Sequence, residues 1–162
     1  MEFRIVDYTT DYMQDVYQLE TQQWGIWGEE AYIKEVKSNQ IVRVALCGDV
    51  IAGICYGTFE NRSFHIEVCC IKPEYQKKGL GTRFLKEMIA LAQEKFDAKI
   101  FRAEAISVYG HANAARVLEH NGFVFVKEEK LYWRREHPEV FCTECHKQPC
   151  ECDALFYELR LK

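Results

Sequence analysis

The sequence lacks any run of about twenty consecutive apolar residues, so none of its segments is expected to span a membrane. Its first residues also lack a basic stretch followed by an apolar one, and we therefore expect no secretion signal and a cytoplasmic location. Basic residues are not in excess, since 21 Lys and Arg stand against 25 Asp and Glu. Because phosphate backbones are bound by basic surfaces, this balance argues against a nucleic-acid partner and is compatible with a cationic substrate.

Internal repeats, low-complexity tracts and linkers are also missing. The 162 residues, 48% of them hydrophobic and 28% charged, have the balance of an ordinary soluble globular protein. We therefore expect a single domain spanning residues 1–162. Within it, residues 137–153 form a cysteine-rich insertion that differs from the rest of the chain.

The spacing of apolar residues predicts an α/β (α+β) chain in which strands outnumber helices. Strands are expected at residues 2–8, three times within 40–73, and at 99–106, 123–134 and 154–161. Helices are expected after Thr9 or Thr10 as N-cap, and at residues 29–37, 80–96 and 111–122. Two-residue turns at Gly48-Asp49 and Asn61-Arg62 join the three central strands. Two helical crossovers imply some parallel pairing, which predicts a mixed, mostly antiparallel sheet flanked by helices.

A glycine-rich loop precedes the helix expected at Leu80. Gly79 and Gly81 lie at the helix start, where unpaired N–H groups point outward and the helix dipole is positive. Glycine lets a phosphate approach such a backbone without an intervening Cβ, and Lys77 and Lys78 add positive charge. The loop matches neither the Walker pattern nor the dinucleotide fingerprint. Taken alone, it is equally typical of an ordinary helix start.

Two motifs resemble those of the GNAT superfamily, the acetyl-CoA-dependent N-acetyltransferases. The stretch QKKGLG, residues 76–81, matches that family's Q/R-x-x-G-x-G/A loop, and the preceding CCIKPEYQ resembles its fourth strand. NAARVLEHNGF, residues 113–123, resembles its later helix and turn. The element order also agrees, except for the cysteine insertion. The resemblance implies the acyl-CoA N-acyltransferase (GNAT) fold.

The same resemblance implies acetyl-CoA as co-substrate and assigns residues to it. The fourth strand would hydrogen-bond the pantetheine arm, the loop amides would hold the pyrophosphate, and the fourth and fifth strands would splay to leave a notch for the thioester. Asn113 occupies a position that often contacts the cofactor, although a polar residue is also common at a helix start. The implied cofactor-binding residues are Cys69, Ile71, Gln76, Lys77, Lys78, Gly79, Leu80, Gly81, Thr82 and Asn113.

An acceptor amine must lose a proton before it attacks a thioester, because the pKa of an alkyl ammonium lies near ~10. Alternation along the fourth strand predicts that His65, Glu67, Cys69 and Ile71 share one face. Glu67 is the first candidate for the general base and His65 the second, and Glu104 on the next strand is a third. Each is also compatible with a solvated or ion-paired position. A fourth-strand N–H, of Cys69 or its neighbour, is expected to donate to the oxyanion.

The chain departs from the family at the position where many members carry a tyrosine five residues beyond Asn113. Leu118 stands there. Tyr109 and Tyr132 are candidates to supply the proton instead, and a thiolate with a pKa near ~8.5 is a tolerable leaving group without one.

Two tryptophans lie where the family's first two helices wall the acceptor pocket. Trp24 and Trp27 could hold a cationic head group, and core packing is the equal alternative. The sequence does not name the acceptor, which could be a peptide N-terminus, a polyamine, an antibiotic or a small metabolite. Homodimer formation also stays open.

The expected function is therefore N-acetyl transfer from acetyl-CoA to a primary amine, by direct attack in a ternary complex. A non-catalytic acyl-CoA-binding or sensing module is one alternative, favoured by the missing tyrosine. A zinc-stabilised protein-interaction module is another. Thiol release from acetyl-CoA in the presence of amines separates the first function from the other two.

Four cysteines fall within the short stretch FCTECHKQPCECD. Cys142 and Cys145 have C-x2-C spacing, and Cys150 and Cys152 have C-x-C spacing, which together predict one structural Zn²⁺ with catalysis elsewhere. His137 or His146 could replace one thiolate. Disulfides are disfavoured by the expected location and by the strain of a C-x-C ring. The remaining cysteines are expected to be buried small hydrophobes in strands: Cys47, Cys55, Cys69 and Cys70.

Overall fold

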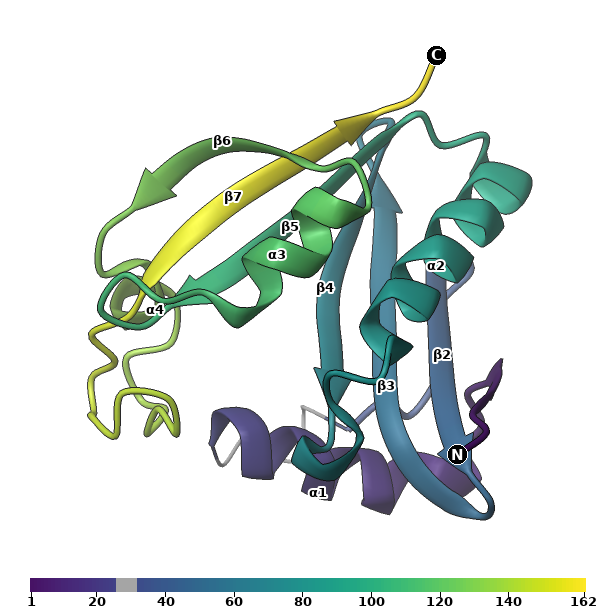
Figure 1. Cartoon of the computed structure of the whole chain (residues 1–162), viewed down its shortest axis with the longest axis horizontal. Helices are drawn as coiled ribbons and strands as arrows, with labels where there is room; N and C mark the ends of the chain where they lie inside the picture. The colour runs from purple at the N-terminus through teal and green to yellow at the C-terminus, as the bar shows by residue number, and fades with distance from the viewer. Residues whose placement is uncertain (26–31) are drawn as a thin grey trace.

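The structure, a computed structural model, describes residues 1–25 and 32–162 (Figure 1). The short 3-10 helices carry the label η. In chain order the elements are β1 (Arg4–Asp7), η1 (Thr10–Tyr12), α1 (Met13–Trp24), β2 (Gln40–Cys47), β3 (Val50–Glu60), β4 (Ser63–Ile71), η3 (Pro73–Tyr75), α2 (Leu80–Phe96), β5 (Ile100–Ser107), α3 (Asn113–His120), β6 (Val124–Glu129), α4 (Tyr132–Glu136) and β7 (Asp153–Arg160).

The strands form one seven-stranded sheet in the order β1-β2-β3-β4-β5-β7-β6. Every neighbouring pair is antiparallel except β4 and β5, which are parallel. The expected mixed, mostly antiparallel sheet is thus confirmed. The last strand, β7, inserts between β5 and β6, so the sheet is completed out of chain order.

The turns between the three central strands confirm the two-residue loops expected from sequence. Gly48 has a φ of 62°, and Asn61 and Arg62 have φ of 49° and 63°. Positive φ at these positions gives the backbone the twist that closes a tight hairpin. Strands β2, β3 and β4 are therefore held in a continuous antiparallel meander.

The two faces of the sheet are covered unequally. Helices α2 and α3 pack on one face over a core that reaches from β2 to β7, including Phe64, Phe84 and Phe101. Helix α1 packs on the other face through Val16 and Leu19, over a smaller core made with β2, β3 and β4. On this second face the half of the sheet formed by β5, β7 and β6 lies beyond α1 (Figure 1).

A β-bulge in β4 corrects the expected face of that strand. Tyr56 pairs with Val68 and the next residue, Gly57, pairs with Ile66, so Glu67 is an extra residue without a partner on β3. The bulge reverses the alternation of side chains beyond it. Cys69 and Ile71 therefore pack on the α2 side with Phe64 and Ile66, and do not share a face with His65.

Two expected elements differ in the structure. Residues 32–37 are not helical, and the Ile33 carbonyl there accepts a hydrogen bond from the Tyr8 hydroxyl at 2.7 Å. Residues 29–31 lie outside the described residues. The strand expected over 123–134 ends at Glu129, and the chain turns into α4 so that Trp133 packs on the cysteines.

Helix ends follow the sequence more closely. Helix α2 begins at Leu80 and ends at Phe96, as the apolar spacing predicted. Thr9 precedes η1 in an extended conformation but makes no side-chain capping bond. After α3, Gly122 takes the left-handed conformation at φ 87°, whereas Asn121 does not.

Candidate active site

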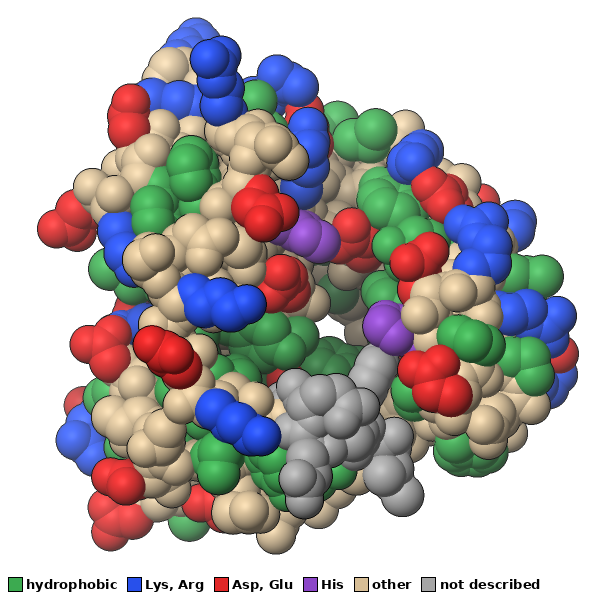
Figure 2. Space-filling view, turned by 180° about the vertical axis from the view of Figure 1, so that it is seen from behind, with side chains coloured by type: hydrophobic (Ala, Val, Ile, Leu, Met, Phe, Trp, Pro, Cys, Tyr) green, Lys and Arg blue, Asp and Glu red, His purple; other side chains and the backbone are tan. Residues whose placement is uncertain are grey.

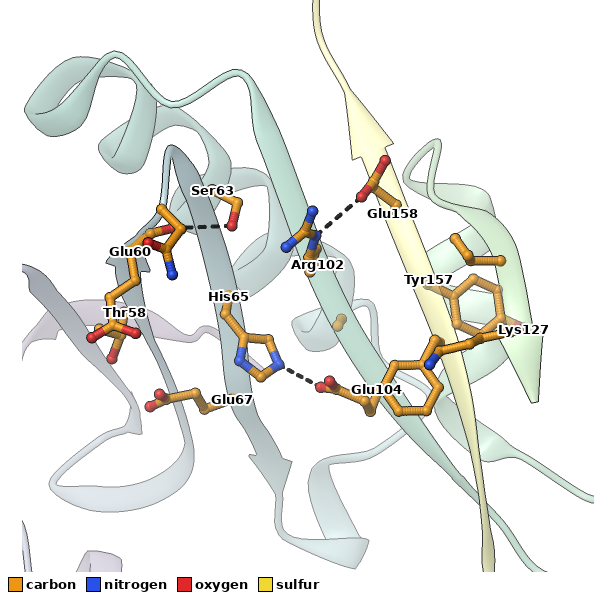
Figure 3. Close-up of a pocket in the computed structure, with 14 residues that line it drawn as sticks. Thr58, Glu60, Ser63, His65, Glu67, Arg102, Glu104, Lys127, Tyr157 and Glu158 are labelled. Atoms are coloured by element: carbon orange, nitrogen blue, oxygen red, sulfur yellow. Dashed lines mark hydrogen bonds and ion pairs between the residues drawn. The ribbon is translucent and has the colours of Figure 1, made fainter. Parts of the chain in front are cut away.

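The parallel strands β4 and β5 separate partway along their length. Their register runs only from Ser63 opposite Ile100 to Ile66 opposite Ala103, although both strands continue beyond these residues. Beyond Ile66, the edge of β4 that faces β5 has no strand partner. The notch expected between the fourth and fifth strands is therefore present (Figure 3).

A pocket of about 510 Å³ lies on the sheet face opposite α2, over the paired stretch of β4 and β5, and it reaches Glu67 and Glu104 where the two strands begin to separate. Side chains from β3, β4, β5, β6 and β7 line it, and those used below are Glu60, His65, Glu67, Arg102, Glu104, Lys127, Phe156 and Glu158. Figure 2 shows this face hollowed between the two halves of the molecule, with acidic and histidine side chains around the hollow.

His65 and Glu104 face one another across the two strands. The His65 Nε2 atom contacts a carboxylate oxygen of Glu104, and their side chains are 41% and 17% exposed (Figure 3). This hydrogen bond raises the pKa of His65 above its usual value of 6.5; burial opposes the shift, and the charges of Glu104 and Glu67 add to it. The pair is therefore a histidine open to the pocket and held by a less exposed carboxylate.

Glu67 lies at the bulge, exposed, and its side chain lines the same pocket (Figure 3). The two predicted catalytic residues, Glu67 and His65, are thus brought together. The link from His65 to Glu104 was not predicted, although Glu104 was named. The parallel register could have indicated this link. It places His65 opposite Arg102, and Glu104 is the next residue of β5 on the same face as Arg102.

The basic side chains of the pocket are largely neutralised by acidic neighbours. Arg102 Nε lies 3.1 Å from a carboxylate oxygen of Glu158, and Lys127 contacts the carboxylate of Glu129. Glu67 and Glu60 form no ion pair with a described residue. The pocket therefore carries net negative charge, which favours a cationic guest.

The loop at residues 76–82 leaves its backbone open to an anion. Gly79 has a φ of 80°, and a Cβ placed on it would meet no atom within 4 Å. A Cβ on Gly81 would lie 3.5 Å from Ile71 Cδ1, an ordinary contact. Gln76 Nε2 donates to the Ile71 carbonyl at 2.9 Å, so this side chain anchors the loop to the end of β4. Lys77 and Lys78 are exposed beside it.

The remaining residues that the resemblance assigns to the cofactor lie on α2 and α3. Leu80 is buried in the core, and Thr82 lies in the first turn of α2. Asn113 is the first residue of α3 and is exposed. Leu118, which replaces the tyrosine of many family members, is buried and cannot reach a substrate.

The two candidate proton donors lie in different surroundings. Tyr109, just beyond β5, is 68% exposed. Tyr132 packs edge-on against Phe156, and burial and the nearby charge of Glu104 raise its pKa. Trp24 is half-buried and packs against the smaller core between α1 and the sheet, which agrees with the core-packing alternative. Trp27 lies outside the described residues.

The four clustered cysteines form a buried group on the second half of the sheet. Their sulfur atoms all lie within 4.8 Å of one another. Cys142 Sγ is 3.9 Å from Cys152 Sγ, and Cys145 Sγ is 3.8 Å from Cys150 Sγ. Sulfurs about 2.3 Å from one tetrahedral ion would be about 3.8 Å apart. The arrangement fits Zn²⁺, and within the described chain neither candidate histidine belongs to the cluster.

The other four cysteines lie in or at the end of strands, as expected. Cys55 and Cys70 are buried, while Cys47 and Cys69 are half-buried. No described cysteine forms a disulfide.

Comparison with known proteins points to one family. The model of the "Acetyltransferase (GNAT) family" matches residues 5–123. No curated protein matches the chain. No helix in the described part of the chain is long and apolar enough to cross a membrane.

Solved structures share the fold at low sequence identity. The ribosomal-protein-S18-alanine N-acetyltransferase of Escherichia coli is 16% identical with a TM-score of 0.78, covering 99% of this chain and 95% of its own. An IAA acetyltransferase from Bacillus cereus is 14% identical with a TM-score of 0.72, and the match covers 99% of this chain and 100% of that protein. A GNAT family acetyltransferase from Elizabethkingia anophelis, solved with acetyl-CoA bound, is 18% identical with a TM-score of 0.70, and the match covers 98% of each chain.

Proposed function

The chain belongs to the GNAT acetyltransferase family, and from this premise we propose that it transfers an acetyl group from acetyl-CoA to a primary amine that binds beside His65. The observation that carries the proposal is the contact between His65 and Glu104, which lies where β4 and β5 separate and opens into the pocket.

The cofactor side has the features that a CoA thioester requires. Amides of residues 77–82 can hold a pyrophosphate, because Gly79 and Gly81 place no side chain over them. The unpaired edge of β4 beyond Ile66 offers backbone groups to an extended pantetheine arm, at Cys69 and Ile71. When bound, acetyl-CoA supplies the acetyl thioester. Asn113 is proposed as a further contact.

His65 and its neighbours manage the proton of the acceptor. An incoming ammonium must give up one proton, and neutral His65 can accept it. The Glu104 carboxylate orients the imidazole and stabilises its protonated form, as the raised pKa of His65 indicates. Glu67 lies beside the pair, where its charge attracts the ammonium, and it is the alternative base. A backbone N–H of β4 near Cys69 is proposed to donate to the oxyanion.

The acidic pocket favours a cationic amine as acceptor. By their names, two of the similar proteins act on a ribosomal-protein alanine and on IAA, which are different kinds of acceptor. A small-molecule or peptide amine therefore suits the present chain, and its pocket does not select between the two.

Thiol release from acetyl-CoA, measured over a panel of amines, tests the proposal. We expect release that depends on amine, and an acetylated product of matching mass. Binding of acetyl-CoA with no release for any amine would instead support the alternative of a non-catalytic acyl-CoA-binding module.

We also propose that Cys142, Cys145, Cys150 and Cys152 hold one Zn²⁺ as a structural ion. Four thiolates close the coordination shell and leave no position for a substrate, so the metal would stabilise the fold and take no part in acetyl transfer. Backbone N–H groups support the sulfurs, as that of Glu151 donates to Cys145 Sγ at 3.4 Å. Reduced, metal-binding thiols suit a cytoplasmic location. Metal analysis of protein purified without chelator should find about one equivalent of zinc.

A further inference from the structure

We propose that the metal-bound cysteine segment, residues 137–153, is a clasp that holds the C-terminal end of α1 against the half of the sheet formed by β5 and β7. This inference rests on the proposed zinc site. The metal would then have a second structural role, which is to position a helix that packs on the other half of the sheet.

The clasp meets α1 at its last turn through a hydrogen bond. Thr143 Oγ1 donates to the backbone carbonyl of Gln23. The last four carbonyls of a helix have no partner within the helix, and a side chain from elsewhere can satisfy them. Thr143 lies between Cys142 and Cys145, so a metal bound by these two ligands would fix the position of its hydroxyl.

Backbone contact at Gly25 extends this interface. A Cβ on Gly25 would lie 2.2 Å from the Phe141 carbonyl oxygen and 3.1 Å from Val140 Cγ1. Only a residue without a side chain permits so close an approach. Gly25, the residue that follows α1, therefore lies directly against Phe141, the residue that precedes the first ligand, Cys142.

The other side of the segment is fixed to the second half of the sheet. The cysteine cluster packs against Ile106 at the end of β5, Val108 just beyond it, and Trp133 of α4. Trp133 Nε1 donates to the Asp153 carbonyl at 3.1 Å, at the start of β7. The cluster is thus built on β5, α4 and β7, with none of the strands under α1.

The clasp consequently joins the two halves of the molecule on either side of the separation between β4 and β5. Helix α1 packs on β2, β3 and β4, whereas the clasp rests on β5 and β7, and β4 and β5 are paired only as far as Ile66 and Ala103. Figure 1 shows the connection between α4 and β7 reaching toward the end of α1. The contact lies on the pocket face, while the loop at 76–82 begins α2 on the opposite face.

This division predicts that the clasp acts locally. Loosening it should release the last turn of α1. The affinity for CoA should stay unchanged, because none of the contacts that define the clasp involves the loop at 76–82 or the α2 side of β4.

Thr143→Val tests the clasp without altering a metal ligand, and Thr143→Ser, which keeps the hydroxyl, is the matched control. Deuterium exchange of the peptide amides at residues 21–25 is the primary measurement, with zinc content and CoA affinity measured on the same protein. For the valine variant we expect one equivalent of zinc, wild-type CoA affinity, and exchange faster by about threefold to tenfold, the loss of one hydrogen bond. The serine variant should exchange like wild type.

Chelation of the zinc gives the second arm, with exchange at residues 21–25 again the readout. Faster exchange there, reversed by added Zn²⁺, supports the clasp. Unchanged exchange in both the zinc-replete valine variant and the chelated protein would overturn it, even if zinc were bound as proposed. The measurement needs no turnover, so a failure of the proposed acetyl transfer would appear separately, as absent thiol release. Protein purified with no zinc would overturn both the metal site and the clasp.

Discussion

The imidazole of His65 on β4 contacts the carboxylate of Glu104 on β5, across the last stretch where these two parallel strands are still paired. Ile66 is the last residue of β4 that pairs with β5, and the bulge begins at the next residue, Glu67. The candidate proton-handling groups, the edge of β4 beyond Ile66 and one end of the acidic pocket therefore meet at one place, which supports the proposed active site.

Replacing His65 by Gln should slow acetyl transfer by about 10²-fold to 10⁴-fold, the usual contribution of a positioned general base. The measurement is kcat/KM for the best amine, with CoA affinity as a check on folding. Glu60→Gln is a suitable control, because Glu60 lines the same pocket without contacting His65. A loss of similar size in the control would indicate a general charge effect instead.

Glu104→Gln should shift the pH dependence of kcat/KM toward lower pH. His65 must be neutral to accept a proton, so activity rises as pH passes through its pKa. The hydrogen bond and charge of Glu104 raise that pKa, and removing the charge lowers it. The rising limb should therefore move down together with a reduced maximum. A limb that stays in place would remove Glu104 from the mechanism.

Glu67→Gln tests the residue that sequence favoured as base. Under saturating acetyl-CoA we expect a lower rate at subsaturating amine, because the variant removes a charge that attracts the ammonium. A wild-type rate and pH profile would exclude Glu67 from catalysis and leave His65 as the base.

Gly81→Val should weaken CoA binding by about tenfold or more, since a branched side chain would shield the amides at the start of α2. Gly81→Ala is the control for folding, because its Cβ would make only ordinary contacts at 3.5 and 3.6 Å. Equal CoA affinity in wild type and the valine variant would show that the phosphates bind elsewhere.

Glu20→Gln should change how stability depends on pH. Glu20 lies on the buried side of α1 with one carboxylate oxygen unpaired, and burial raises its pKa to about 7, an effect partly offset by a hydrogen bond with Tyr56. Because the folded pKa exceeds the unfolded value of 4.5, the folded state loses stability as pH rises through 7. The shift corresponds to about 3 kcal/mol. Urea unfolding at pH 5 and pH 8 should show this loss in wild type and not in the variant.

The sequence predicted well those features that depend on neighbouring residues. Helix α2 follows from its own apolar spacing, and the turn at Asn61-Arg62 from its own backbone preferences. What it could not supply depends on partners far along the chain. The bulge at Glu67 exists only relative to β3, so alternation alone assigned Cys69 to the wrong face.

The same distinction explains the other differences. The carbonyl of Ile33 is engaged by the hydroxyl of Tyr8, 25 residues earlier, and the local helical pattern could not show it. The end of β6 is decided by Trp133, which leaves the strand direction to cover the cysteines. Likewise the contact between two of the three candidate bases, His65 and Glu104, depends on the register of β4 on β5.

The placement of β7 between β5 and β6 has a consequence for how the protein is made. During synthesis, β6 leaves the ribosome before β7, its partner in the described sheet, and it must wait until residues 153–160 follow. The cysteines lie immediately before that strand, so all four ligands become available just as the sheet can close. Capture of the ion and completion of the sheet would then be nearly simultaneous, and cells short of zinc should accumulate newly made chains in which the backbone of β6 is unpaired and open to aggregation.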